Sequence, residues 1–313
     1  MSHVVDADPL GARPSRPSPS AGRGLSSPAG RLLMLAAVVA ALVGAFLGSG
    51  VLPGMTPTAE AADGWLGPDS TWLAPATPAF SIWSVIYAGL LGYGVWQTLA
   101  AAQSERQGRL RPWILASLVL NVAWLWVVQA GWLGLSVVVI LLLAAVLVRV
   151  LVILETTARP RHWADRILVD GVQGLHLGWV TVATLANLTA WLASRGWTGA
   201  PLMPTTWAQV MLVLAVILGA VTAVYSGGRL SAAAALAWGL VWIGVGRADG
   251  SGPNSGAVAV TAWGSAVIVL LCWLAALWLS HRSATGEARD LILDALDGGD
   301  DPVDGVRRTD PAR

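Results

Sequence analysis

Long apolar runs separated by short polar segments fill the chain from residue 32 to residue 280. A transmembrane helix needs about 20 mostly apolar residues, and this pattern predicts eight such helices. Only Gly131 and Trp132 separate the third run from the fourth, so these two helices are expected to form a tight antiparallel hairpin. The predicted spans are 32–52, 78–101, 112–130, 133–153, 167–193, 206–226, 230–246 and 257–280, and the seventh is the shortest.

The arginines give this set of spans an orientation. Every one of the 19 basic residues is Arg. With eight spans, seventeen of them fall on one side, and Arg195 and Arg247 fall on the other. Cytoplasmic segments of membrane proteins carry the excess of positive charge. Both termini are therefore predicted to lie in the cytoplasm.

The amino-acid composition excludes several classes of protein. Hydrophobic residues make up 55% of the chain and charged residues only 12%, against about 25% charged in ordinary soluble domains. This excludes a soluble globular enzyme and makes the lipid bilayer the expected partner. The net charge of +1 argues against nucleic acid. Cys272 has no second cysteine to pair with, and we expect a buried, inert thiol.

Two terminal segments lack the apolar pattern. Residues 1–30 are rich in Pro, Ser, Gly and Arg and are expected to form a disordered cytoplasmic arm. Residues 283–313 are expected to form an acidic cytoplasmic tail, although 291–296 has the pattern of a small amphipathic helix. A second interpretation treats the first run as a secretory signal cleaved near Ala59-Glu60-Ala61. That run is longer than the 7–15 residues of a signal core.

Templates for metal binding, phosphate loops and nucleophilic catalysis are missing from the sequence, and no catalytic residue is predicted. His176 is the only ionisable group deep within a predicted span. One interpretation is an imidazole hydrogen-bonded between helices. The other is a histidine that carries a proton or touches a ligand.

Aromatic and amide side chains recur at helical spacing in three spans. Residues four apart share one face of a helix, and an Asn in hydrocarbon needs a hydrogen-bonding partner. Core packing would explain such a stripe, and so would a ligand site. The residues are Trp83 and Tyr87 in the second span, Asn121 and Trp124 in the third, and Trp179, Ala183, Asn187 and Trp191 in the fifth.

In the predicted topology these groups lie at similar depth, toward the extracytoplasmic side. Directly above them is the long connection 53–77, which contains Trp65 and Trp72 and no Arg. We interpret it as a lid over an apolar pocket suited to a flat hydrophobic ligand. Other tryptophans at span ends, such as Trp132 and Trp197, are typical of a membrane-interface belt.

At these residues the chain resembles the TspO/MBR family of tryptophan-rich sensory or translocator proteins. Trp179, Ala183, Asn187 and Trp191 match the family's W-x-x-x-A-x-x-x-N-x-x-x-W in its last helix. The third-helix N-x-x-W and the second-helix W-x-x-x-Y are matched as well. Where the family often has Pro-Tyr before the last helix's Trp, this chain has Leu175 and His176.

The resemblance implies a TspO-like five-helix bundle over residues 31–195, often dimeric. It also implies a pocket that binds porphyrins or sterols, so a porphyrin or heme-like ligand is expected rather than a built-in cofactor. Residues 196–282 would add three further helices. The ligand-binding set would be Trp83, Tyr87, Asn121, Trp124, His176, Trp179, Ala183, Asn187 and Trp191.

Three functions follow from these observations. The first is a membrane sensor, regulator or carrier for a flat hydrophobic molecule such as a tetrapyrrole or sterol. The second is an eight-span secondary transporter of a small lipophilic molecule. By family resemblance, the third is light-dependent breakdown of porphyrin. The use of Arg without Lys, together with abundant Ala and Gly, suggests a GC-rich bacterial genome, and hence the bacterial cytoplasmic (inner) membrane.

Overall fold

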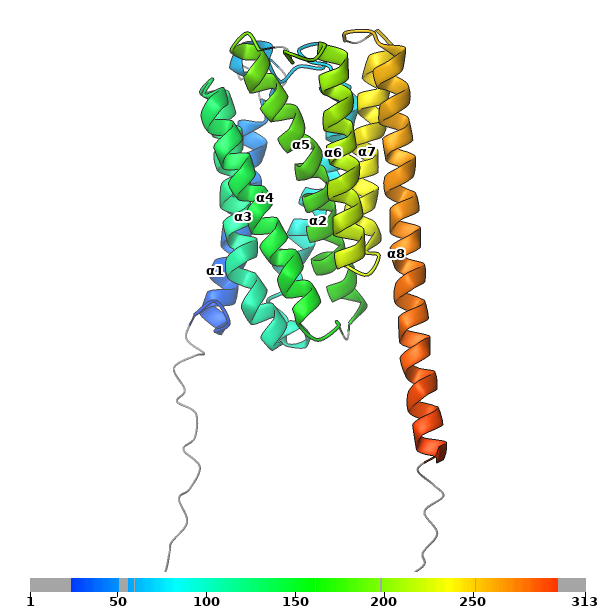
Figure 1. Cartoon of the computed structure of the whole chain (residues 1–313). Helices are drawn as coiled ribbons and strands as arrows, with labels where there is room; N and C mark the ends of the chain where they lie inside the picture. The colour runs from blue at the N-terminus through cyan, green and yellow to red at the C-terminus, as the bar shows by residue number, and fades with distance from the viewer. Residues whose placement is uncertain are drawn as a thin grey trace, which may run out of the picture.

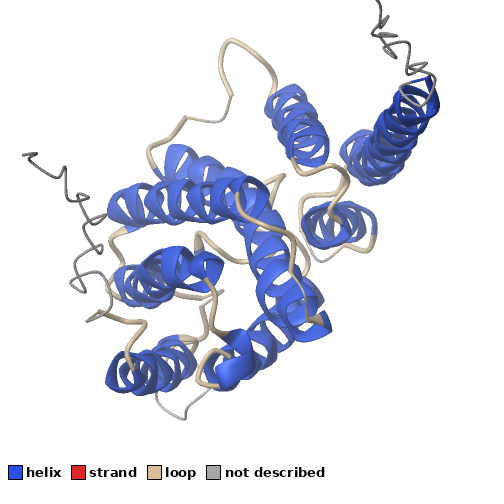
Figure 2. Cartoon of the chain, turned by 90° about the horizontal axis from the view of Figure 1, so that it is seen from below, coloured by secondary structure: helices blue, strands red, loops and turns tan. Residues whose placement is uncertain are grey.

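The computed structural model describes residues 24–50, 56–58, 60–160, 162–197, 199–250 and 252–297. These residues form an all-α bundle without strands, and eight of its helical segments are long and apolar enough to cross a membrane (Figures 1 and 2). The predicted fold class is therefore confirmed. The helices are α1 (Pro28–Gly48), α2 (Ile82–Trp96), α3 (Glu105–Gln129), α4 (Leu133–Thr156), α5 (Val172–Ser194), α6 (Pro204–Tyr225), α7 (Leu230–Ala248) and α8 (Gly256–Asp297).

Short helical turns extend several of these elements. The 3-10 turn η3 (Thr77–Ser81) leads into α2, and a π-helical turn η5 (Asp165–Gly171) leads into α5. Two more 3-10 turns, η2 (Ala62–Gly64) and η4 (Ala100–Ala102), lie in the connections on either side of α2. The turn η5 places two aspartates, Asp165 and Asp170, at the start of the fifth span.

The start of α3 differs from the sequence-based prediction. Pro112 was expected to open the third span, but α3 begins at Glu105 and contains Pro112 in its interior. The hydroxyl of Ser104 accepts a 3.2 Å hydrogen bond from the Gln107 amide and caps the helix. The prediction was wrong because proline also opens helices, and the polar first turns resemble a loop.

Three other helix boundaries also differ from the predicted ones. The helix α2 ends at Trp96, earlier than the predicted residue 101, while α8 continues to Asp297 through part of the segment expected as a tail. The helix α1 begins at Pro28, inside the expected arm. The rest of that arm (1–23), part of the lid (51–55), one residue of the A-x-A motif (Ala59) and the end of the tail (298–313) lie outside the described residues.

The helices gather into two groups that meet at α5 and α7. Figure 1 shows α1, α3 and α4 on one side of the bundle and α6, α7 and α8 on the other. At the meeting point Gly178 of α5 faces the Ala232 carbonyl of α7 so closely that a Cβ on Gly178 would overlap it. Small residues permit such close approach of membrane helices, so the two groups are packed backbone to backbone.

An ion-pair network joins the helices at the end of the bundle that carries most of the arginines. Asp170 receives Arg106 on one oxygen and Arg229 on the other, each at 2.6 Å, and Arg229 also pairs with Glu155. Burial disfavours the charge of Arg229, but its hydrogen bonds to Glu155 and Asp170 outweigh burial and raise its pKa. The spacing of these residues in the sequence does not indicate the network, because its members come from three separate connections between helices and their ends.

Candidate functional site

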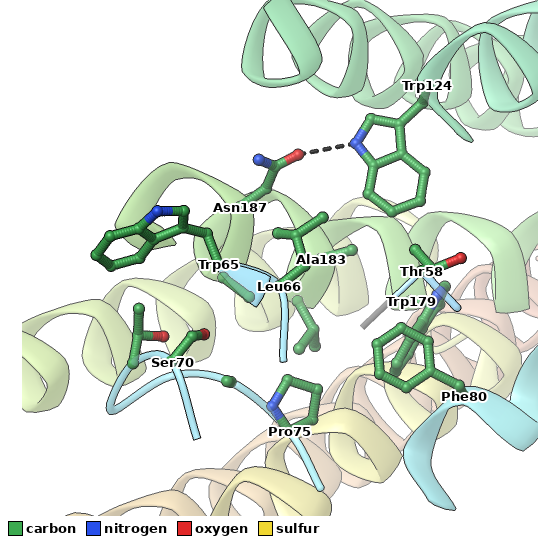
Figure 3. Close-up of a pocket in the computed structure, with 14 residues that line it drawn as sticks. Thr58, Trp65, Leu66, Ser70, Pro75, Phe80, Trp124, Trp179, Ala183 and Asn187 are labelled. Atoms are coloured by element: carbon green, nitrogen blue, oxygen red, sulfur yellow. Dashed lines mark hydrogen bonds between the residues drawn. The ribbon is translucent and has the colours of Figure 1, made fainter. Parts of the chain in front are cut away.

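A small cavity lies directly beneath the connection between α1 and α2. Its volume is about 40 Å³. The α1–α2 connection covers it, and η3, α3 and α5 form its walls (Figure 3). The described residues that line it are Thr58, Trp65, Leu66, Ser70, Thr71, Ala74, Pro75, Phe80, Trp124, Trp179, Val182, Ala183, Ala186 and Asn187. None of these carries a charge.

A hydrogen-bonded amide anchors one wall of this cavity. Asn187 accepts a 2.8 Å hydrogen bond from Nε1 of Trp124, shown as the dashed line in Figure 3. It also exchanges hydrogen bonds with the Ser136 hydroxyl, at 3.0 and 3.2 Å. Asn187 is 1% exposed, so these bonds supply the partners that a buried amide requires. They join α3, α4 and α5 at the depth of the cavity.

An aromatic cluster continues from the cavity into the bundle. Trp179 meets Phe80 edge to face at 5.6 Å between ring centroids, and it meets Trp83 at 6.3 Å. Trp83 stacks on Tyr87 at 5.1 Å and meets His176 at 5.7 Å. Aromatic pairs favour these offset and perpendicular arrangements. The cluster therefore links α2 to α5.

The predicted site residues divide into three sets. Trp65, Trp124, Trp179, Ala183 and Asn187 line the cavity. Three more, Trp83, Tyr87 and His176, belong to the aromatic cluster, and Asn121 donates a 3.2 Å hydrogen bond to Tyr87. Trp72 and Trp191 are not among the residues that line the cavity.

Trp72 and Trp191 each contact another part of the structure instead. Trp72 packs against the core formed by α6, α7 and α8. Trp191 lines a separate open cavity of about 430 Å³, together with Trp65, Trp132 and Arg195. Trp65 therefore stands between the buried cavity and this outer one.

Several residues of the site had no signal in the sequence. Phe80 and the loop residues Ser70, Thr71, Ala74 and Pro75 line the cavity although they follow no helical stripe. Ser136 could have been found, because a serine near the start of the fourth span lies at the same depth as Asn187. The pairing itself depends on how α4 and α5 are rotated against each other, which spacing within one helix does not reveal.

Buried polar atoms without partners also occur here. Among the described residues, nothing bonds to Nε1 of Trp179 or to either ring nitrogen of His176, although both side chains are at most 1% exposed. Nε1 of Trp179 is thus an unused donor on a residue that lines the cavity. No cluster of His, Cys, Asp or Glu that could hold a metal occurs in the described part of the chain.

The lid is attached to α7. Arg247, 1% exposed, donates hydrogen bonds to the carbonyl oxygens of Thr71 and Pro68 at 2.5 Å and of Ala74 at 3.3 Å. The backbone amide of Ala76 bonds to the Trp242 carbonyl at 3.1 Å. The helices added after α5 therefore hold the cover of the cavity in place.

Comparison with known proteins decides the family. The family model described as TSPO-like protein matches residues 31–275. The chain belongs to this family. The match runs from α1 through α7 and ends at residue 275, near the middle of α8, so α6, α7 and the first part of α8 fall inside the matched region of this TSPO-like chain. Neither the curated proteins nor the solved structures gave a match.

Proposed function

We propose that this TSPO-like membrane protein binds a flat hydrophobic ligand, porphyrin-like or sterol-like, beneath the α1–α2 lid and acts as a sensor, regulator or carrier. The observation that carries the proposal is the cavity itself. It is lined by indole rings, small apolar residues and one fixed amide, and an aromatic loop covers it. Ligand sites for apolar molecules have this mixture of apolar walls and a few placed polar groups.

The structure represents a closed form of the proposed site. A volume of about 40 Å³ holds only small molecules such as water, whereas ligand pockets measure roughly 300–1,000 Å³. A porphyrin or sterol therefore requires the lid to move away from α5. Trp65 is placed to move first, because it separates the buried cavity from the outer one of about 430 Å³.

The side chains that line the cavity favour the uncharged part of such a ligand over its charged groups. With no charged side chain among its described lining residues, the cavity suits an uncharged ring system. Nε1 of Trp179 would donate to an acceptor on that ring. A porphyrin's carboxylates would remain at the mouth, toward Arg195 in the outer cavity.

The test is a titration of purified full-length protein in detergent with protoporphyrin, read by tryptophan quenching and by the ligand's absorbance. Ala183→Phe fills the cavity without removing a hydrogen bond, and we expect it to weaken binding at least tenfold. Ala275→Phe is the matched control, because Ala275 is an exposed position on α8. Asn187→Leu should weaken binding as well.

Unchanged porphyrin affinity in both Ala183→Phe and Asn187→Leu would refute the proposed site. The same titration with a sterol separates the two ligand classes. Illumination of the porphyrin complex tests the light-dependent reaction: a spectral change no greater than that of free porphyrin in detergent would dismiss it.

A second candidate is an eight-span secondary transporter of a small lipophilic molecule. Its support is the division of the helices into two groups that meet along α5 and α7, because transporters move one bundle against another. Ligand flux into proteoliposomes would favour it, and binding without flux would favour the sensor.

The orientation and assembly remain parts of the same proposal. We place the arginine-rich end in the cytoplasm of a bacterium, as the arginine distribution favours, and expect a homodimer by family resemblance. Labelling of single cysteines in intact cells and the mass of the detergent complex test the two points.

A further inference from the structure

A second cavity opens at the arginine-rich end of the bundle, far from the lid. Its volume is about 520 Å³. It lies between the first turns of α3 and the connection from α4 to η5. Three arginines contribute to its lining, namely Arg106, Arg109 and Arg159. The ligand site proposed above does not use any of them.

Arg106 has donors that the fold leaves unused. Its side chain is only 7% exposed, and Nη2 pairs with Asp170 at 2.6 Å. Among the described residues, nothing accepts a hydrogen bond from its Nε or Nη1. A buried guanidinium normally has all its donors satisfied. Nε and Nη1 of Arg106 are buried without an acceptor, and a turn of the side chain toward the cavity that it lines would bring them to one.

The rest of the cavity is suited to an anion. Its wall includes the N-terminus of the 25-residue helix α3, where the helix dipole is positive and backbone amides point outward. The Ser104 hydroxyl accepts from the Gln107 amide and keeps its own proton to donate. Arg159, from the connection after α4, is exposed at the opposite wall.

The two carboxylates in the lining are already engaged. Glu105 pairs with Arg109 at 2.6 Å on the exposed surface. Asp165 accepts hydrogen bonds of 2.9 Å from Nε1 of Trp96 and from the Gln107 amide group. His162 lies edge to face with the Trp96 ring at 5.8 Å. Of the described lining arginines, Arg106 pairs with Asp170 and Arg109 pairs with Glu105, whereas Arg159 makes no ion pair with a described residue.

We propose that this cavity binds a phosphate group, with Arg106, Arg109 and Arg159 as its ligating cations. Planar guanidinium groups match the oxygens of phosphate and bind them in pairs. The phosphate belongs either to the headgroup of an anionic phospholipid, since the cavity lies at one end of the transmembrane bundle, or to a soluble phosphate compound.

The ion-pair network allows Arg106 to take part. Asp170 also holds Arg229 at 2.6 Å through its other oxygen. When the guanidinium of Arg106 turns toward the bound phosphate, the carboxylate keeps a cationic partner. Binding of phosphate would thus change the contacts of η5, the turn that leads into α5, and α5 lines the cavity beneath the lid.

The experiment uses purified full-length protein in detergent and has two arms. The first titrates inorganic phosphate against chloride at constant ionic strength. The second titrates short-chain phosphatidylglycerol against phosphatidylcholine of the same chain length. Both follow the thermal unfolding midpoint, and calorimetry gives the affinity. We expect saturable stabilisation by phosphate, by phosphatidylglycerol or by both, and the responding arm identifies the source.

Paired variants make the test specific. Arg109→Gln/Arg159→Gln should weaken binding about tenfold or more, and because both side chains are exposed its unliganded midpoint should stay near that of the parent. Arg166→Gln removes an exposed arginine that lines only the neighbouring cavity, and it should bind like the parent. The proposal is overturned by no saturable response in either arm, by parent-like binding in the double variant, or by an equal loss in Arg166→Gln.

Discussion

Nε1 of Trp124 on α3 donates a 2.8 Å hydrogen bond to Oδ1 of Asn187 on α5. The two residues are 63 positions apart in the chain, and both are more than nine-tenths buried. Ser136 on α4 completes the contact. Three helices of the bundle are thus tied together at the wall of the cavity, and the same amide that stabilises the fold faces the proposed ligand.

Asn187→Leu should lower the free energy of unfolding by about 1–3 kcal/mol, because it leaves the indole N–H of Trp124 buried without its acceptor, whereas the Ser136 hydroxyl keeps the Leu133 carbonyl. Unfolding in mixed detergent micelles measures the change. Ser136→Ala should cost less, since Trp124 and Asn187 keep each other. A larger loss in Ser136→Ala would show that the serine, not the indole, is the main partner.

Gly178→Ala should destabilise the protein by about 1–3 kcal/mol, the usual cost of overpacking. Its Cβ would overlap the Ala232 carbonyl oxygen and push α5 away from α7. Gly264→Ala is the matched control on α8, because nothing lies within 4 Å of a Cβ there, and it should be neutral or slightly stabilising. Equal midpoints for the two variants would contradict the close packing of α5 on α7.

Arg247→Met should loosen the lid. It removes hydrogen bonds to three carbonyl oxygens, those of Pro68, Thr71 and Ala74. Hydrogen exchange should therefore accelerate at lid amides such as those of Gly67 and Ser70, and ligand association should become faster. Arg166→Met is the control, since Arg166 is exposed at the opposite end of the bundle, away from the lid. Unchanged exchange in the lid would mean that Arg247 does not hold it.

Asp170→Asn should cost about 3 kcal/mol, because the buried cation of Arg106 loses its carboxylate. Glu105→Gln breaks the exposed pair with Arg109, whose side chains are 56% and 80% exposed, and should change stability by less than about 0.5 kcal/mol. Thermal unfolding of both variants provides the comparison. Equal losses would show that burial of the network contributes little.

The order of the helices could be predicted because hydrophobic runs and arginine positions are local properties of the chain. The fifth span shows how far such local properties reach. Trp179, Ala183 and Asn187, which helical spacing puts on one face, all line the cavity. Trp191 continues the stripe but lines the outer cavity instead. One more helical turn places it in this outer cavity, which it lines together with Trp65 of the lid.

Contacts between distant segments could not be predicted in the same way. Arg106 and Asp170 are separated by 64 residues, and the sequence offers several arginines to each carboxylate. Arg247 looked like one of two stray charges on the side poor in arginine, yet it is buried against the lid. A small-residue signal was available in α7, where Ala232 to Ala235 and Gly239 indicate close helix packing.

The hydrogen bonds that Arg247 donates to the described residues of the lid all end on main-chain oxygens. Among the side chains of the loop, the Asp69 carboxylate adds an electrostatic attraction to Arg247, but these hydrogen bonds do not use the side chains of Ser70 and Thr71. Substitutions at Ser70 or Thr71 would therefore change the roof of the cavity while the loop stays fastened, provided that its backbone keeps the same course. Arg247 on α7 thus keeps the loop closed over the cavity, while the side chains of the loop determine which ligand fits beneath it. The ligand preference could therefore be changed by substitutions in the loop without opening it.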